Sequence, residues 1–264
     1  MNAHRAPAVA GLFYPADAHT LRTTVRQLLG GAAPAQADAP PKAMIAPHAG
    51  YVYSGPIAAS GYAQLQRLRG RVRRVVLLGP VHRVPVRGLA APTVAAFATP
   101  LGEVPIDGDA LAALRNCPQV CFSDAPHAPE HSLEVHLPFL QETLGDFSLV
   151  PLAVGDAQPA EVAEVIERLW GGEETLIVVS SDLSHYLPYV NACARDEFTV
   201  ETILRLSPEL DHEQACGATP INGLLLAARR RQLRPHLLDL RNSGDTAGDK
   251  SRVVGYAAVA LHPS

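Results

Sequence analysis

Two kinds of hydrophobic pattern alternate along this chain. Short, nearly uninterrupted apolar runs are typical of strands buried on both faces of a sheet, and apolar residues recurring every three or four positions are typical of helices. The apolar runs predict strands at residues 42–46, 75–78, 147–154, 175–179, 236–240 and 253–261. The periodic stretches predict helices at residues 17–29, 56–68, 109–115, 132–144, 160–170, 189–206, 208–215 and 220–231.

This alternation predicts an α/β fold with a central mixed, mostly parallel sheet flanked by helices on both faces. Residues 89–104 are rich in Val, Ala, Thr and Pro, and they predict one or two short strands, as a hairpin on a sheet edge. The two C-terminal strands are candidates for antiparallel edges. Residues 32–41 form an Ala/Pro-rich loop, and no clear linker follows them. We therefore expect one domain over residues 1–264.

Composition narrows the class of protein. The chain has 264 residues, of which 47% are hydrophobic and 18% charged, and its net charge is −4 with histidine neutral. The compact basic run at residues 229–231 ends a predicted helix, where cations are favourable, so we expect no nucleic-acid partner. No apolar stretch is long enough to span a bilayer and no signal-peptide pattern is present, so we expect no membrane partner and a cytoplasmic protein. The four cysteines form no CxxC pair and are expected to be free thiols or ligands.

Three of the predicted strands end in a turn that is followed by a histidine. These histidines are His48, His82 and His185. Because ligands of open α/β sheets bind outside the carboxyl ends of the strands, the three imidazoles predict a metal or proton-transfer site at one edge of the sheet. His48 and His82 are the best candidates for metal ligands, since imidazole is a common ligand of zinc, copper and iron. The alternative is that each merely caps its strand through hydrogen bonds.

Two further groups carry candidate chemistry. Asp182 and His185 share one tight turn, so the carboxylate could orient the imidazole for acid–base work; the alternative is a helix-capping aspartate beside a surface histidine. Cys216 precedes Gly217 at a predicted helix boundary. A helix N-terminus lowers the pKa of a thiol, so Cys216 is a candidate metal ligand or nucleophile, with a buried structural cysteine as the alternative.

The segment around residues 131–138 holds another pair of histidines. His131 and His136 are five positions apart, which on the predicted helix separates them by about 140°, so they do not form a two-histidine clamp. We expect one of them to face the site as a supporting donor and the other to face solvent. The remaining histidines, His127 among them, are expected to be surface or structural residues. The chain has no GxSxG elbow, Walker loop or dinucleotide fingerprint.

Several ordered blocks of this sequence together resemble the Memo family, whose bacterial and archaeal members are often named AmmeMemoRadiSam system protein B. The opening block at residues 46–55 reads Ala-Pro-His-Ala-Gly-Tyr-Val-Tyr-Ser-Gly. Further matching blocks lie at residues 11–15, 78–82, 131–138, 180–186, 216–217 with 220–221, and 242–258. The resemblance covers almost the whole chain. It implies a fold similar to that of class III extradiol dioxygenases, which are non-haem iron enzymes.

The resemblance also implies a site. The metal ligands of the family correspond to His48, His82 and Cys216 in this sequence. The family's active-site aspartate and histidine correspond to Asp182 and His185. His185 would act as the acid and base, by analogy with the dioxygenases. His136 is a further expected contact.

This chain departs from the family at the second histidine. Members commonly read Gly-Pro-Ser-His-His there, whereas residues 79–83 read Gly-Pro-Val-His-Arg. The cysteine is a difference from the dioxygenases, which use a carboxylate as the third ligand. A thiolate shifts metal preference toward Cu(I), zinc or a differently tuned iron.

The resemblance therefore predicts a metal-binding protein with an iron or copper site, zinc being a further option, and redox or dioxygenase-like activity on a small organic substrate. It leaves enzymatic activity open. One alternative is a non-catalytic binding module for a peptide or partner protein, with radical S-adenosylmethionine and AMMECR1-like proteins as the implied partners. Another is a Cys216 nucleophile assisted by His185.

Overall fold

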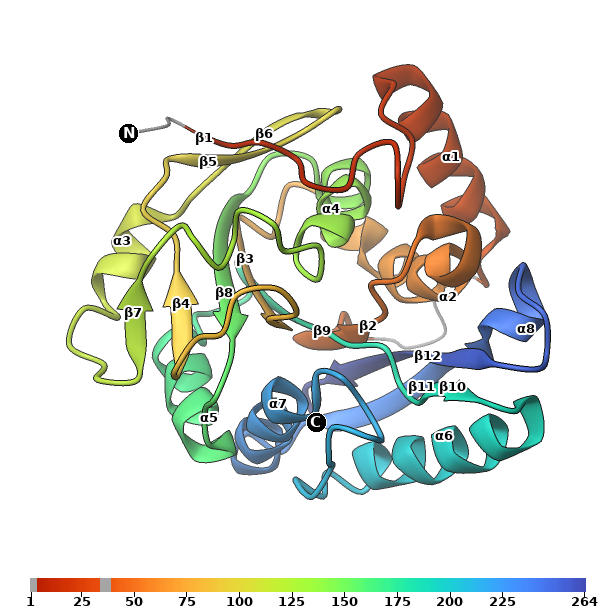
Figure 1. Ribbon diagram of the computed structural model, residues 1–264. Coiled ribbons are helices and arrows are strands. Elements are labelled where there is room, and N and C mark those ends of the chain that lie inside the picture. The colour runs from red at the N-terminus through yellow and green to blue at the C-terminus, as the bar shows by residue number, and fades with distance from the viewer. Residues whose placement is uncertain (1–3, 34–38) are drawn as a thin grey trace.

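A nine-stranded mixed sheet forms the centre of the molecule. The computed structural model describes residues 4–33 and 39–264, and within them the strands run in the order β10-β12-β2-β9-β3-β8-β4-β7, with β11 paired to β12 (Figure 1). The strands of this sheet are β2 (Ala43–Ala46), β3 (Arg74–Pro80), β4 (Leu89–Ala91), β7 (Val120–Phe122), β8 (Ser148–Val154), β9 (Thr175–Ser180), β10 (His185–Leu187), β11 (Arg234–Asn242) and β12 (Val253–His262). A second sheet has the order β1 (His4–Arg5), β5 (Ala96–Thr99) and β6 (Gly102–Pro105).

The predicted α/β architecture is confirmed. Strands β2, β9, β3 and β8 are parallel at the centre of the sheet, and β12 pairs antiparallel with β2, β10 and β11. A hairpin is present where residues 89–104 predicted one; it consists of β5 and β6, ends at Pro105 and belongs to the small sheet, whereas β4 joins the central sheet. The Ala/Pro-rich loop predicted at residues 32–41 lies partly outside the described residues.

Helices cover both faces of the sheet (Figure 1). They are α1 (Ala18–Gly31), α2 (Tyr51–Tyr62), α3 (Gly108–Ala112), α4 (Leu137–Leu144), α5 (Pro159–Arg168), α6 (Tyr189–Leu204), α7 (Ala218–Arg230) and α8 (Ser243–Thr246), with 3₁₀ turns η1 (Ala63–Leu68) and η2 (Glu134–His136). None of the helices in the described part of the chain combines the length and apolarity that a bilayer crossing needs.

Side-chain alternation along the central strands builds two hydrophobic cores. In β3, Val76 and Leu78 join the core that contains α5 and α7, whereas Val75 and Leu77 join the core that contains α1, α2 and α4. This is the period of two that a strand imposes. Because both faces are apolar, the polar residues of these segments are confined to the ends of the strands.

The helix predicted at residues 56–68 begins earlier, as α2 at Tyr51, and ends as the 3₁₀ turn η1. Two other predicted helices differ more from the structure. The helix predicted at residues 208–215 is wrong, because the segment between α6 and α7 forms turns in which the Asp211 carboxylate accepts hydrogen bonds from the backbone N–H groups of Glu213 and Gln214. The helix predicted at residues 132–144 is interrupted: a turn and η2 precede α4. The second difference determines where His131 points.

Gly79 lets the loop before α4 pack against the ends of β3 and β9. A Cβ atom at Gly79 would lie 2.9 Å from Leu133 Cδ2, 3.0 Å from Ser132 Oγ and 3.1 Å from Ser180 Cβ. At Gly30 in α1, by contrast, a Cβ atom would meet nothing within 4 Å. The close approach at Gly79 is therefore a steric requirement of the fold.

We expect Gly79→Ala to lower the free energy of unfolding by about 1–3 kcal/mol, because overpacking shifts the Ser132 loop. The matched control Gly30→Ala should leave it unchanged or raise it by up to about 1 kcal/mol, since alanine favours a helix. Urea denaturation measures both. Equal stability of the two variants would contradict the packing account.

Candidate metal centre

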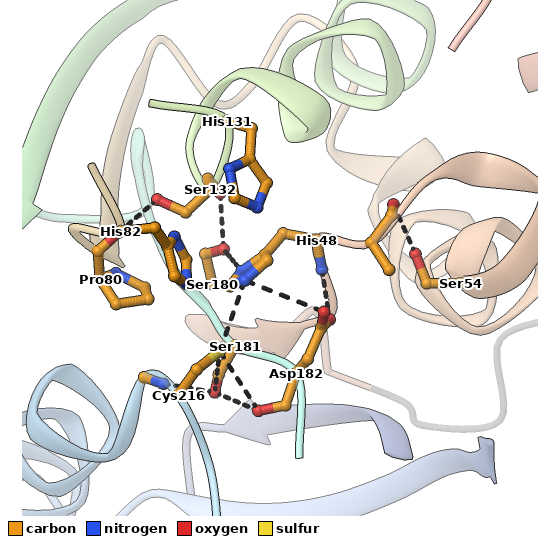
Figure 2. Close-up of polar contacts among 12 residues, drawn as sticks. His48, Ser54, Pro80, His82, His131, Ser132, Ser180, Ser181, Asp182 and Cys216 are labelled. Carbon is orange, nitrogen blue, oxygen red and sulfur yellow. Dashed lines mark hydrogen bonds and ion pairs between the residues drawn. The ribbon is translucent and has the colours of Figure 1, made fainter. Parts of the chain in front are cut away.

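The carboxyl ends of three neighbouring parallel strands meet at one edge of the sheet. The loop after β2 carries His48, the loop after β3 carries His82, and the segment after β9 carries Asp182. Because β9 lies between β2 and β3, these three loops are adjacent. Two more segments reach the same place: His131 comes from the loop before η2 and Cys216 from the turn before α7 (Figure 2).

His48, His82 and His131 form a cluster suited to a metal ion. One potential ligand atom from each lies within 4.8 Å of the other two. The ring centroids are 5.1 Å apart for His48 and His82, 5.4 Å for His48 and His131, and 4.7 Å for His82 and His131. His48 is buried, His131 is half-buried and His82 is exposed, so the cluster is open on the His82 side. Ligands on one tetrahedral ion would be about 3.3 Å apart, so the rings would close slightly around it.

A serine hydroxyl fixes the tautomer of His48. Ser180 Oγ donates its proton to the carbonyl oxygen of Ser132 at 2.6 Å. It therefore accepts the hydrogen bond that joins it to His48 Nδ1, also at 2.6 Å (Figure 2). The Nδ1 atom of His48 carries the proton, and its Nε2 atom keeps a free lone pair for a metal.

A buried carboxylate, that of Glu130, fixes the tautomer of His82. Glu130 Oε1 lies 2.9 Å from His82 Nδ1 and 3.2 Å from His131 Nδ1. Glu130 also accepts hydrogen bonds from the backbone N–H groups of His82, His131 and Ser132. Burial opposes the charge on Glu130, but these hydrogen bonds, led by that from His82, outweigh it and lower its pKa to about 2. The ionised carboxylate thus leaves Nε2 of His82 free to bind a metal.

Cys216 lies within ligand distance of one member of this cluster, His48, and outside the group of three whose ligand atoms all lie within 4.8 Å of one another. Its Sγ atom is 3.4 Å from His48 Nε2 and 3.6 Å from the carbonyl oxygen of Asp182. Nitrogen and sulfur ligands of one tetrahedral ion, with bonds of about 2.0 and 2.3 Å, are about 3.5 Å apart. The donor pair therefore fits one ion without rearrangement.

The thiol of Cys216 is not activated by the helix that follows it. Burial, and then the charge of Asp182, raise its pKa to about 12. This differs from the depressed pKa expected at a helix N-terminus, because Cys216 lies before the capping residue Gly217 and is largely desolvated. A bound metal would deprotonate a thiol that the protein alone keeps neutral.

Asp182 and His185 lie in different surroundings. Asp182 is buried; its Oδ1 accepts a hydrogen bond from the backbone N–H of His48 at 2.8 Å, and its Oδ2 is 3.9 Å from His48 Nε2. Burial raises the pKa of Asp182 to about 7. His185, at the start of β10, is exposed, and its ring packs edge-on against Tyr186 at 5.8 Å. The carboxylate thus belongs to the interior of the cluster and the imidazole to the surface.

His136 lies behind the cluster in the core. It is 1% exposed, its Nδ1 atom is 2.7 Å from the Tyr62 hydroxyl, and burial lowers its pKa to about 3. Neither His131 nor His136 faces solvent, in contrast to expectation, because the segment between them is a turn and a 3₁₀ helix instead of an α-helix. His127 is likewise buried and bonds the carbonyl oxygen of Ala90.

The N-terminal segment secures the loop that carries Glu130 and His131. Arg5 donates hydrogen bonds to the carbonyl oxygens of His127 and Glu130, and it forms a buried 2.7 Å ion pair with Glu134. Glu134 also accepts from the hydroxyl of Tyr14. Sequence reasoning did not identify Glu130, Ser180 or the place of His131 in the cluster. The one available signal was the acid directly before His131 in a histidine-rich loop.

We expect Ser180→Ala to weaken Zn²⁺ binding about 10–100-fold, because His48 loses the acceptor that fixes its tautomer. Competition with a chromophoric chelator measures the affinity. The control is Ser60→Ala on α2, which removes a half-buried hydroxyl that donates a hydrogen bond to Asp239 on β11, and it should bind Zn²⁺ like the parent protein. Equal affinities in the two variants would contradict this role for Ser180.

Comparison with known proteins places this geometry in a family. The family model described as "Memo-like protein" matches residues 5–260. A MEMO1 family protein of Ignicoccus hospitalis is 38% identical, covering 97% of this chain and 97% of its own. A MEMO1 family protein of Methanopyrus kandleri is 38% identical and covers 97% of this chain and 98% of its own. Another, of Aquifex aeolicus, is 37% identical and covers 96% of this chain and 97% of its own. The chain therefore belongs to the Memo family.

Proposed function

We propose that this protein binds one iron or copper ion through His48, His82, Cys216 and the neighbouring His131, and uses it for redox chemistry on a small organic substrate. The observation that carries the proposal is the convergence of three imidazoles, with Cys216 Sγ 3.4 Å from His48 Nε2. Hydrogen bonds behind His48 and His82 leave their Nε2 lone pairs free. Histidines whose tautomer and ring orientation are fixed by such hydrogen bonds are typical of metal sites in proteins.

The donor set favours a transition metal. Imidazole suits zinc, copper and iron, and a thiolate adds preference for soft ions such as Cu(I). The similarity to non-haem iron dioxygenases that the family resemblance implies would favour iron. A carboxylate, Asp182, lies 3.9 Å from His48 Nε2 and would add a hard oxygen beside the soft sulfur.

When bound, the ion would supply electron exchange and polarise a coordinated substrate. The chain's own groups would position that substrate and move protons. The exposed side of the cluster, at His82, gives a substrate access. Asp182 can accept a proton inside the cluster, and the exposed His185 can exchange one with solvent. Glu130 holds the Nδ1 proton of His82 and keeps its ring oriented.

Metal analysis tests the binding. Protein purified without a histidine tag should hold close to one equivalent of iron or copper by inductively coupled plasma mass spectrometry. His82→Ala and Cys216→Ser should each lose most of it, because a ligand is removed. The exposed His236 on β11 provides the control, and His236→Ala should keep the metal. Undiminished metal in both ligand variants would overturn the proposed site.

Oxygen uptake tests the redox chemistry. The metal-replete protein should consume oxygen with at least one member of a catechol and thiol panel, and Asp182→Asn should slow that uptake about 100-fold or more if Asp182 moves a proton. Full metal loading with no uptake on any panel member would contradict the redox role and favour a binding module.

A further inference from the structure

A cavity lies at the end of the central strands opposite to the metal centre. Its volume is about 500 Å³, within the range of small-molecule sites. Lys42, directly before β2, and Thr175, the first residue of β9, lie on its wall, so it opens where the parallel strands begin. The metal centre lies where the same strands end. Nothing in the proposed chemistry uses this cavity.

The wall of the cavity combines apolar surface with positive charge. Leu68, Val72 and Leu233 provide buried apolar side chains. Trp170 lies beside them, with Lys42 Nζ 5.4 Å and the Arg231 guanidinium 5.1 Å from its ring centroid. Two cations are therefore held over one aromatic ring at the cavity wall.

One carboxylate on the cavity wall, Glu173, is exposed and pairs with Arg71 at 3.0 Å, which leaves Lys42 and Arg231 as the cations of the wall. Lys42 Nζ donates to the carbonyl oxygens of Trp170, Gly172 and Thr175 at 2.6–2.7 Å, so its hydrogen bonds are satisfied by neutral acceptors. Burial lowers the pKa of Lys42 to about 8, and the nearby charge of Glu174 opposes this without forming an ion pair with it. Within residues 4–33 and 39–264, Arg231 forms no ion pair. Its planar donor group is available for a carboxylate, sulfonate or phosphate.

We propose that this cavity binds a small amphiphilic anion, with its apolar body against Leu68, Val72 and Leu233 and its charged group on Arg231 beside Lys42. Charge complementarity selects the anion, and the apolar walls select a ligand with a hydrophobic body over a bare inorganic ion. This site is separate from the metal centre, so the two proposals can fail independently.

The chain contains a single tryptophan, Trp170, so tryptophan fluorescence reports directly on the cavity. The probe is 8-anilinonaphthalene-1-sulfonate, an aromatic anion that accepts energy from tryptophan. Titration into the intact protein should give saturable quenching of Trp170 with sensitised probe emission. Absence of energy transfer would overturn the proposal.

Arg231→Gln should raise the Kd of the probe about fivefold, the effect expected from losing one partly exposed charge pair. Arg230→Gln is the matched control, because Arg230 is the preceding residue on α7 and pairs with Glu167 at 2.9 Å. It should leave the Kd unchanged. The uncharged analogue N-phenyl-1-naphthylamine should bind both variants and the parent protein equally. Recognition of an anion would be contradicted if Arg231→Gln left the Kd of the sulfonate unchanged. It would also be contradicted if the substitution weakened binding of the neutral analogue equally.

Discussion

Hydrogen bonds behind the histidine rings are the constraint on which the candidate centre depends. An imidazole can bind a metal only through the nitrogen that lacks a proton, so three rings facing one point need their protons held on the far side. Ser180 holds the Nδ1 proton of His48, and Glu130 holds that of His82 and lies 3.2 Å from Nδ1 of His131. Glu130 remains charged in the interior because its oxygens accept several N–H groups.

The fold and the centre depend on each other through close packing at the strand ends. Gly79 leaves room for the Ser132 loop, and a Cβ atom at Gly217 would fall 2.6 Å from the carbonyl oxygen of Ser180. The Arg5–Glu134 ion pair joins the N-terminal segment to the loop that carries Glu130. Residues from five distant parts of the sequence therefore meet because small residues and buried polar contacts bring their loops together.

The sequence predicted the parts of this arrangement that follow from burial. Apolar runs at β2, β3 and β9 identify strands that are buried on both faces, and parallel strands place the residues that follow them at one edge. His48 and His82 were accordingly found at that edge, with Asp182 beside them. The third imidazole predicted there, His185, lies exposed at the start of β10, and His131 completes the group of three instead. The resemblance to the Memo family added Cys216, which no local pattern distinguished from a structural cysteine.

The remaining parts depend on tertiary contacts that no periodicity encodes. The sequence pattern predicts an α-helical geometry for His131 and His136, but a turn before η2 directs His131 toward His48 and His82. Glu130 lies in an irregular loop, and its importance arises from donors supplied by His82 on another loop and by Ser132 on its own. The pKa of Cys216 is raised because desolvation outweighs the helix that follows. The turns at residues 208–215 form because Asp211 bonds its own backbone neighbours in competition with a helix.

Anomalous diffraction from a crystal of the metal-replete protein, collected at the iron and copper absorption edges, tests the central claim most directly. The account predicts one peak about 2.0–2.3 Å from Nε2 of His48, Nε2 of His82 and Sγ of Cys216, with His131 beside it. A bound ion elsewhere in the molecule, with none at these atoms, would contradict it.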